Sequence, residues 1–589
     1  MIEKMQKLTL LVAEKERDSF LLALRRAGVM HVNKIKEPDT PDLPEAEEEL
    51  SAINKAISIL SVYEKRKDTR REEEKETELY FAAERVIEAF NEKEKLAQKI
   101  RGLEKEREWF DVWGKADPGT IKDLKDKRIN IRLYRLGKDD YRKIKEKDSI
   151  KVIARDSGFV YVALLTYGTD EKLDFEEVNV PSKNIRAIEE EIRSLKAQED
   201  EKEEYLKGAA KDLDGLEKLK VKVEKKLELL SVKFGMKDEE KFSYLQGFCP
   251  SRYLEKVLQL AKGHAFGYII EEPGEPSETP TLVTNPLWID MIKPVFQFMN
   301  ILPGYDEFDV SLAFLVFLSL FFAMLVGDAG YGIIFLLITH IVHKRAKNLP
   351  KQPIFLMYLM SGATIVWGAL TGTWFGPSQI AKLPIISGMV VKQLNNQDFM
   401  MFFCFLIGAV HMTVAHLIRI YRFINSPKVL ADIGWIMIIW GMFFLAGFLV
   451  INRPFPSFAS YLIYVGSGLV LVFESFQKNI LKGMGETLIN LPLSVIATFS
   501  DVVSYLRLFA VGYASVVVSQ SFNEMAIGDG VNSVIRGLIT ALILFFGHLL
   551  NAVLSIMAVL VHGVRLNMLE FSSHMKMAWS GKEYKPFTE

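Results

Sequence analysis

Hydrophobic and polar positions divide this chain into two contrasting parts. Up to about residue 275 the sequence is crowded with Lys, Glu, Arg and Asp, whereas from about Phe308 long apolar runs alternate with short polar loops. An apolar run of about 20 residues is the length that a helix needs to cross a bilayer. The pattern therefore predicts a soluble part, a linker at 276–307 and a transmembrane part at 308–589.

Eight apolar stretches of spanning length are predicted in the second part. They lie at about 309–326, 329–343, 354–375, 399–420, 432–452, 458–476, 486–525 and 533–571. The last two exceed what a bilayer requires, so we expect two long, tilted helices there. Cations gather in the loops on one side, at Lys344, Arg345, Arg419, Arg422 and Lys428, and in the C-terminal segment at Lys576, Lys582 and Lys585. The positive-inside rule therefore predicts a multi-pass protein of the cell membrane, with the N-terminal part and the C-terminus in the cytoplasm.

Two strand–helix–strand patterns, far apart in the sequence, predict one small α+β lobe. The first has its helix at Glu16–Gly28 and the second at Ser251–Lys262. The strands are expected at Lys7–Val12, Val29–Ile35, Tyr244–Phe248 and Gly267–Ile270. Both patterns can share one ferredoxin-like sheet if the intervening insertion leaves and returns at the same place. We assign residues 1–40 and 240–275 to this proximal lobe.

The insertion has a heptad register with alternating spacings of three and four, which is typical of a coiled coil; its positions are apolar except for Glu199, Lys202 and Lys220. The apolar positions are Ile185, Ile188, Ile192, Leu195, Leu206, Ala209, Leu213, Leu216, Val223, Leu227 and Leu230. A helical stretch from Leu43 to about Trp113 supplies the partner. We expect an antiparallel shaft of residues 41–118 and 182–239, with a distal α+β lobe at 119–181. The fold class is thus mostly α, with a coiled-coil arm that carries two small lobes.

Composition and motifs restrict the chemistry of the chain. Lys and Arg number 74 against 75 Asp and Glu, and the formal net charge of -1 leaves no basic block for nucleic acid. The two cysteines, Cys249 and Cys404, offer neither a disulfide framework nor metal-ligand spacing. GDAGYG at 327–332 is too short and wrongly placed for a nucleotide loop, and indicates a turn or close helix packing. We expect no cofactor, no metal and no catalytic site for ATP, and the arm is interpreted as a docking device.

Polar residues form a stripe on each of the last two expected spans. In the first, residues three or four apart share a helix face: Ser494, Thr498, Asp501, Ser504 and Arg507. In the second, the stripe comprises His548, Asn551, Ser555, His562 and Arg565, with Glu570 one turn beyond. A charge at the centre of a bilayer costs about 2.5–3.5 kcal/mol on insertion scales. Both arginines therefore require partners or water.

These polar residues also have structural interpretations. Either arginine can form an ion pair with Asp501 or Glu570 that only locks helices together, although intramembrane charges usually mark ion paths. His562 is equally well a hydrogen-bonded core histidine or a proton relay. For His548 and Asp501, structural hydrogen bonding is as good an interpretation as function.

The motifs and their order resemble subunit a of V-type ATPases, called subunit I in archaeal and bacterial A/V-type enzymes. The resemblance covers essentially the whole chain and rests on EKMQKLTLLV…LRRAGVMHV near the start, GDAGYG at 327–332, SYLRLFA at 504–510, HGVRLNMLEF at 562–571 and YKPF at 584–587. It implies that Arg507 is the family's essential arginine, Arg565 its second arginine and His562 its motif histidine. Ser555 stands where eukaryotic members have a glutamate, and Asp501 where they have a histidine, which favours a prokaryotic member.

The resemblance also implies a function. Such a subunit is the stator of a rotary ATPase: its membrane part forms ion half-channels beside a rotating proteolipid c-ring, and its arm anchors peripheral-stalk subunits of the E/G type near a central-stalk subunit. Arg507 would discharge ring carboxylates and so couple H⁺ or Na⁺ movement to ATP synthesis or hydrolysis on other subunits, because arginine stays protonated. The half-channel candidates are His562, Ser555, Asn551, His548, Asp501, Ser504 and Glu570.

Two other classes remain open from the sequence. A secondary transporter would show internal repeats with interrupted helices at matching positions, and none is evident. A structural membrane anchor explains the arm but leaves the two polar stripes without a purpose. The choice between H⁺ and Na⁺, and between synthesis and hydrolysis, also remains open.

Overall fold

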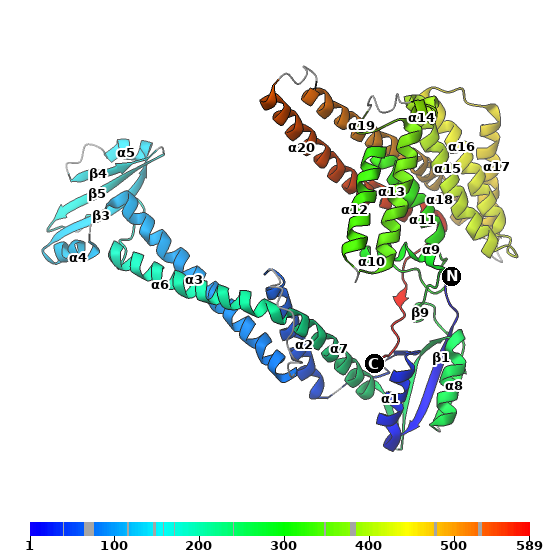
Figure 1. Cartoon of the computed structure of the whole chain (residues 1–589), viewed down its shortest axis with the longest axis horizontal. Coiled ribbons are helices and arrows are strands. Elements are labelled where there is room, and N and C mark those ends of the chain that lie inside the picture. Colours follow the sequence, from blue (N-terminus) through cyan, green and yellow to red (C-terminus); the bar gives the residue numbers. More distant parts are fainter. Residues whose placement is uncertain are drawn as a thin grey trace.

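An elongated arm extends from a bundle of apolar helices, and a small lobe lies where the two meet (Figure 1). The computed structural model describes residues 1–33, 35–38, 40–63, 76–114, 117–144, 149–156, 158–169, 171–239, 241–264, 266–346, 349–376, 384–475, 480–527 and 533–589. Residues 64–75 of the expected shaft and residue 476 of an expected span lie outside these ranges. The mostly helical fold, with two α+β lobes on the arm, is confirmed.

The lobe beside the bundle combines two segments that are far apart in the sequence. Its elements are β1 (Met5–Ala13), α1 (Arg17–Ala27), β2 (His31–Asn33), β6 (Lys237–Glu239), β7 (Phe242–Pro250), α8 (Leu254–Gly263) and β8 (Gly267–Glu271). The antiparallel order β2-β7-β1-β8 is the ferredoxin-like arrangement. Leu8, Leu10 and Val12 are buried along β1 whereas Leu11 is exposed, so one face of the sheet carries the core shared with α1 and α8.

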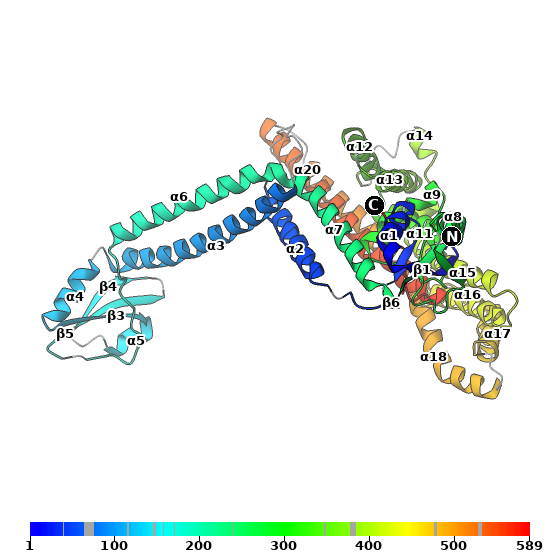
Figure 2. The same cartoon turned by 90° about the horizontal axis from the view of Figure 1, so that it is seen from below.

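The shaft of the arm consists of α2 (Asp42–Leu60), α3 (Glu76–Trp113), α6 (Ile185–Ala209) and α7 (Leu213–Gly235). Helix α2 packs against α7, and α3 packs against α6. The expected heptad residues Ile188, Leu206 and Leu216 are fully buried. The returning half of the shaft is not one continuous helix, because a 3₁₀ turn at Ala210–Asp212 separates α6 from α7. The shaft bends there (Figure 2).

The distal lobe closes the far end of the shaft. It comprises α4 (Pro118–Asp126), β3 (Ile129–Gly137), α5 (Lys138–Ile144), β4 (Ile150–Arg155) and β5 (Phe159–Tyr167). The strands pair antiparallel in the order β3-β5-β4. Trp113, at the end of α3, packs with Leu133 and Ala163 of the sheet and so joins lobe and shaft.

The apolar half forms the helical bundle. After the short helices α9 (Leu287–Asp290) and α10 (Lys293–Phe298) come α11 (Ser311–Val326), α12 (Ala329–Arg345), α13 (Lys351–Thr371), α14 (Pro384–Ser387), α15 (Gln397–Arg422), α16 (Val429–Ile451), α17 (Ser457–Phe473), α18 (Ile480–Ser504), α19 (Leu506–Ile527), α20 (Val534–Ala558), two π-helical segments η6 (Val559–Gly563) and η7 (Leu566–Phe571), and α21 (Ser572–Met575). Its core is largely aromatic and aliphatic.

Eight apolar helical segments occupy the predicted positions, but fewer are long enough to span a bilayer unaided. Among the described residues five are long and apolar enough: Lys351–Thr371, Gln397–Arg422, Val429–Ile451, Lys482–Ile527 and Val534–Met575. Helices α11 and α12 are shorter and bent by 120° against each other, and would add a sixth if they form one broken span. Helix α17 has 17 residues. Apolar run length counts α11 and α12 as two spans, whereas these short helices, with the bend between them, provide at most one.

That turn is built by a glycine and an aspartate. Gly327 ends α11 with φ of 68°, a conformation that favours glycine. Asp328 then caps α12, because its carboxylate accepts from the Gly330 N–H at 2.7 Å. The GDAGYG motif is thus a glycine-rich turn between α11 and α12, as predicted.

The C-terminal tail ties the bundle to the proximal lobe (Figure 1). Strand β10 (Lys582–Glu583) pairs in parallel with β9 (Pro280–Thr281). Phe587 is 1% exposed and belongs to the core of the lobe, and its N–H donates to the Met30 carbonyl at 2.9 Å. The Tyr584 hydroxyl donates to the backbone just before β2 at 2.7 Å. The arm and the C-terminus therefore lie on the same side of the bundle.

We expect Phe587→Ala to loosen the tail from the lobe. Truncating a buried phenylalanine costs about 3–5 kcal/mol, and about 3 kcal/mol corresponds to roughly a hundredfold change in an equilibrium. Hydrogen exchange on the full chain in detergent should show faster exchange at residues 581–588 and unchanged exchange in the distal lobe. Lys582→Ala, at an exposed position, is the control. Equal protection in both variants and the parent would contradict the docking role.

Docking of the tail should also weaken in acid through His31. Burial lowers the pKa of His31 below its ordinary 6.5, and the charges of Lys585 and Lys582 lower it further. A hydrogen bond with the Lys585 backbone raises the pKa, but by less than these effects lower it. His31 therefore binds protons more readily when the tail is undocked. The contribution of neutral His31 to the stability of the docked tail is complete above pH 6.5 and is lost as the pH falls through the pKa that His31 has in the docked state. Tail protection measured against pH should fall in that window, and His31→Gln should flatten the profile. An identical profile in the variant would exclude His31.

Candidate functional site

Arg507 lies at the junction of α18 and α19 and is paired within its own chain. Its Nη2 lies 2.6 Å from Oε1 of Glu570 in η7, and its Nε donates to the Ser504 carbonyl at 3.0 Å. The Glu570 side chain is 4% exposed, whereas that of Arg507 is 23% exposed. The second carboxylate oxygen of Glu570 is buried without a hydrogen-bond partner among the described residues. The ion pair named above as a structural alternative for the arginine is therefore present.

A buried tyrosine holds the junction in place. Tyr505 lies between the last residue of α18 and the first of α19, is fully buried, and its hydroxyl is 2.8 Å from Nδ1 of His411 in α15. The His411 ring stacks on Phe317 and on Phe571, with centroids 3.9 and 4.5 Å away. The junction is thereby fixed against three other elements, which places Arg507 beside η7.

The polar stripe expected along the last span is not one face. His548, Asn551 and Ser555 lie on the inner side of α20, but beyond it His562 is half-buried and Arg565 is exposed. The intervening η6 and the subsequent η7 are π-helical. A π turn takes up an extra residue, which rotates the residues beyond it by about 100° relative to an α-helix. The single-stripe prediction is wrong for this reason.

The inner residues of α20 join a tyrosine cluster, which we define as Tyr331, Ser515, Ser519, Asn523, His548, Asn551 and Ser555. The Tyr331 hydroxyl lies 2.8 Å from His548 Nδ1 and accepts from Asn551 Nδ2 at 3.0 Å. Ser555 Oγ lies 3.0 Å from Ser515 Oγ, and Asn523 Oδ1 is 3.0 Å from His548 Nε2. Polar groups of α12, α19 and α20 thus converge inside the bundle.

Asp328 positions the tyrosine of this cluster. Besides capping α12, its carboxylate accepts from the backbone N–H groups of Phe375 and Gly376, at 2.9 and 2.7 Å. Asp328 is 1% exposed. A buried carboxylate is tolerated where backbone donors surround it, so this residue anchors the loop after α13 to the start of α12.

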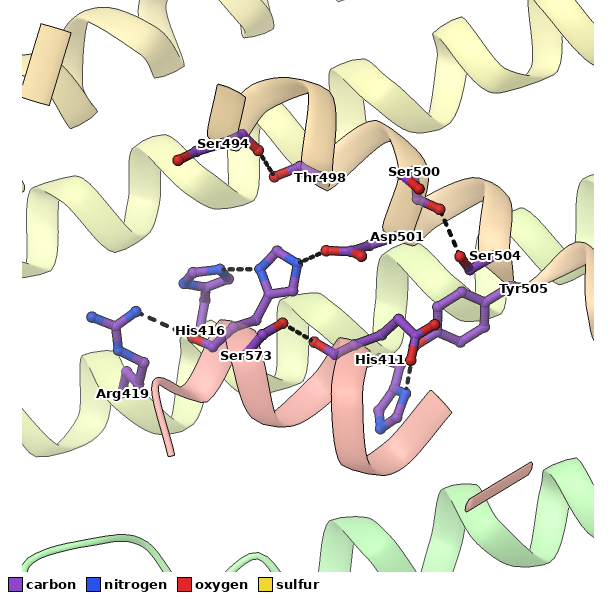
Figure 3. A network of polar contacts seen from close by, with 12 residues as sticks. His411, His416, Arg419, Ser494, Thr498, Ser500, Asp501, Ser504, Tyr505 and Ser573 are labelled. Carbon is purple, nitrogen blue, oxygen red and sulfur yellow. Dashed lines mark hydrogen bonds and ion pairs between the residues drawn. The ribbon is translucent and has the colours of Figure 1, made fainter. Parts of the chain in front are cut away.

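A second group, the histidine cluster, lies at the arm-side end of the bundle and comprises Asp501, His574, His416, Asp432 and Arg419. Figure 3 shows Asp501, His416 and Arg419 of this cluster. Asp501 Oδ2 is 3.2 Å from His574 Nε2, and His574 Nδ1 is 3.1 Å from His416 Nε2. His416 Nδ1 is 2.9 Å from Asp432 Oδ1, which Arg419 also contacts at 3.0 Å. Helices α15, α16, α18 and α21 meet here.

Arg507 lies between the two clusters along the α18–α19 segment. Asp501 precedes it by six residues and Ser515 comes eight residues after it, which at about 1.5 Å per residue corresponds to roughly 9 and 12 Å along the axis. Polar groups are therefore arranged on both sides of one partly exposed cation, and among the described residues no continuous row of hydrogen bonds joins the two clusters.

The sequence-predicted residues are distributed over these places. His548, Asn551 and Ser555 meet in the tyrosine cluster, Asp501 belongs to the histidine cluster, and Glu570 and Ser504 contact Arg507. His562 and Arg565 form no hydrogen bond or ion pair with the residues that the structure describes. Within the described ranges, no group of His, Cys, Asp and Glu is arranged to hold a metal.

Several polar residues of the two clusters and of the Tyr505 junction are not predicted by the sequence pattern. His411, His416 and Asp432 lie inside expected spans and are 0–2% exposed, and polar residues within apolar runs are themselves a signal. Tyr331 lies in a glycine-rich motif whose spacing indicates only a turn. His574 comes after the last expected span and carries no local pattern.

Comparisons with known proteins give a consistent result. No protein-family model matches the chain. The chain is 31% identical to the V-type ATP synthase subunit I of Borreliella burgdorferi, over 100% of this chain and 99% of that protein. It is 30% identical to V-type ATP synthase subunit I 1 of Treponema pallidum, over 100% of both, and 25% identical to the A-type ATP synthase subunit I of Methanocaldococcus jannaschii, over 71% and 65%. A crystal structure of the cytoplasmic N-terminal domain of subunit I, homolog of subunit a, of V-ATPase matches 45% of this chain and 100% of that one, at 15% identity and a TM-score of 0.26.

Proposed function

The chain belongs to the subunit I family of V-type and A-type ATP synthases, and on this basis we propose that Arg507 discharges the carboxylates of a rotating proteolipid ring. The chain is a membrane subunit of a rotary ATP synthase. In the proposal it is the stator, it forms two ion half-channels beside the ring, and ATP is made or hydrolysed on other subunits.

The proposed role of Arg507 follows from the free-energy cost of placing an ionised carboxylate in lipid. A ring carboxylate can face lipid only when H⁺ or Na⁺ neutralises it, and a fixed cation can replace that ion at the stator. Arginine suits this role because it stays protonated and therefore attracts the carboxylate without carrying protons itself. The ion released at Arg507 leaves by one half-channel, and the next ion enters by the other.

The partly exposed guanidinium of Arg507 is the observation that carries the proposal. Glu570 and the Ser504 carbonyl engage Nη2 and Nε, whereas Nη1 makes no hydrogen bond to a described residue. The side chain is also 23% exposed at the edge of the bundle. A ring carboxylate can thus reach Nη1 while Glu570 stays in place, or can displace Glu570.

The two clusters supply walls for the two half-channels. The tyrosine cluster holds His548, Asn551 and Ser555, and Asp501 belongs to the histidine cluster on the arm side. Their separation on either side of Arg507 supports two offset paths, because an ion cannot pass a fixed cation directly. Ser504 and Glu570 border Arg507, and the half-buried His562 and the exposed Arg565 would lie toward the ring.

The arm provides the stator's attachment. We assign residues 1–40 and 240–275 to the proximal lobe, 41–118 and 182–239 to the shaft, 119–181 to the distal lobe, 276–307 to the linker and 308–589 to the ion-translocating part. The distal lobe would bind peripheral-stalk subunits of the E/G type, and the proximal lobe would lie near a central-stalk subunit. The docked tail places the C-terminus beside the arm, which supports a cytoplasmic location of both in the cell membrane.

Arg507→Ala should abolish coupled transport. Removing one partner of a buried ion pair costs about 3–5 kcal/mol. If this free energy is lost from the transition state of the transport step, the transport rate falls at least about a hundredfold. The measurement is ATP-driven ion uptake by reconstituted vesicles containing the whole ATPase, with and without Na⁺. Arg507→Lys should retain part of the activity, since lysine keeps the charge but lacks the planar fork.

Glu570→Gln is the matched control for that measurement. If Arg507 only locks α19 to η7, the glutamine variant breaks the same pair and should lose as much transport as Arg507→Ala. If Arg507 meets ring carboxylates, Glu570→Gln should transport far better than Arg507→Ala. Full coupled pumping by Arg507→Ala would refute the proposal.

Arg565→Ala should slow transport less, by a few-fold. Its side chain is exposed and forms no ion pair with a described residue, so its removal leaves no buried charge unpaired. The expected effect is a slower hand-over of ring carboxylates near Arg507, seen as reduced uptake at unchanged ATPase assembly. Unchanged turnover and coupling would assign Arg565 a structural role only.

A further inference from the structure

The histidine cluster contains a row of four titratable side chains that the Arg507 mechanism does not use. From Asp501 the row passes through His574 and His416 to Asp432, with contacts of 3.2, 3.1 and 2.9 Å. Figure 3 shows the part of the row between Asp501 and His416. Each residue comes from a different element, in the order α18, α21, α15 and α16. All four ring nitrogens of the two histidines are engaged in this row.

Counting protons shows that two neutral histidines cannot satisfy the row. Each of the three contacts requires one proton, ionised carboxylates only accept, and a neutral imidazole carries a single N–H. With two neutral rings that both face their carboxylates, the 3.1 Å contact between His574 Nδ1 and His416 Nε2 would join two lone pairs. A third proton removes the conflict, because one ring then donates to the other.

The surrounding charges favour the same count. Arg419, Asp432, Asp501 and His411 contact or interact with the two histidines, and Glu474 after α17, Lys576 after α21 and Glu570 of η7 interact in turn with Arg419 or Asp501 or lie next to His574. Glu570 is balanced by Arg507. Three carboxylates then remain against two cations, Arg419 and Lys576, so one extra proton on the histidines makes the group neutral.

Exposure gives the row a direction. The side chains of His416 and Asp432 are each 2% exposed, and Asp432 is also held by Arg419. His574 is 8% exposed and Asp501 is 27% exposed. Asp432 therefore forms a closed end that orients His416, and His416 orients His574. Exchange with the outside is possible at Asp501, the residue that precedes Arg507 by six positions.

We propose that His574 and His416 share one stored proton, and that His574 passes it to and from Asp501 on the ion path next to Arg507. This rests on the proposed function and adds to it that the ion on the arm side moves as a proton. His574 and Asp501 are the exchanging groups, and His416 and Asp432 are positioning residues.

The transfer conserves every hydrogen bond of the row. In the stored state His574 carries protons on both nitrogens and donates to Asp501 and to His416, while His416 Nδ1–H donates to Asp432. The Nε2–H bond of His574 then breaks and an O–H bond forms at Asp501 Oδ2. Asp501 now donates to His574 Nε2, and the other two contacts are unchanged. Asp501 can release this proton at its exposed side and regain one in the reverse step.

The test is the pH profile of His574→Gln in the whole ATPase reconstituted into vesicles. Glutamine keeps a polar side chain but cannot store a proton. We expect ATP-driven acidification to be at least about tenfold slower than in the parent at neutral pH. Asp501 would then take protons directly from solvent, so the variant's rate should rise about tenfold for each unit by which the arm-side pH is lowered, whereas the parent's rate should change little. Structural damage would lower the rate equally at every pH.

His340→Gln provides the control, because His340 lies on α12, is exposed and contacts Tyr358 rather than the cluster. It should pump like the parent. A parent-like rate for His574→Gln, or a loss that is parallel at all pH values, overturns the relay. Uptake of radioactive Na⁺ by the parent in place of acidification also overturns it, while leaving the arginine proposal intact. Retained pumping by Arg507→Ala refutes the arginine proposal independently of the relay.

If the His574→Gln variant does not assemble, Asp501→Asn provides a second test of the relay. The substitution is at the exposed end of the row, keeps the side-chain shape and removes the acceptor that receives the proton. We expect the same slow transport with His574 still present, but without recovery at low pH, since asparagine cannot be protonated. Parent-like acidification by Asp501→Asn overturns the relay.

Discussion

A charged group in apolar surroundings requires an opposite charge or water, and the membrane part is organised around that requirement. The Arg507–Glu570 pair at 2.6 Å joins α19 to η7. The π-helical turns of η6 and η7 make this possible, because they turn Glu570 inward and leave Arg565 exposed. The helix geometry that disrupts the regular stripe is therefore also what provides the arginine with its partner.

The same requirement explains why the remaining polar groups form two compact clusters. Asp328 is surrounded by backbone donors, Asp432 by Arg419 and His416, and the inner polar residues of α20 by the Tyr331 hydroxyl and α19. Each cluster satisfies its own polar atoms, and the Asp501 end of the histidine cluster stays partly exposed. In the proposed function this arrangement corresponds to separate, local paths for an ion.

The arm is attached to the membrane part by the ends of the chain. The N-terminal ammonium pairs with Asp309 just before α11, and the C-terminal tail inserts Phe587 into the core of the proximal lobe. The ferredoxin-like sheet is therefore held from two sides. Two separate attachments restrain rotation of the lobe better than a single linker does, as the proposed stator role requires.

Local pattern determined much of this protein. Period-2 and period-3.5 spacings of apolar residues predicted both lobes and the shaft, run length predicted the apolar segments, and the position of Arg507 inside a span could be read from the sequence. Tertiary structure alone decided which groups meet: Glu570 with Arg507, 63 residues apart, and His416 with His574, 158 residues apart. Helix packing brings such residues together, and no local period reports it. A π turn likewise shifts the face of a helix without changing the pattern of residue types, so the face that Arg565 presents was decided only by the folded chain.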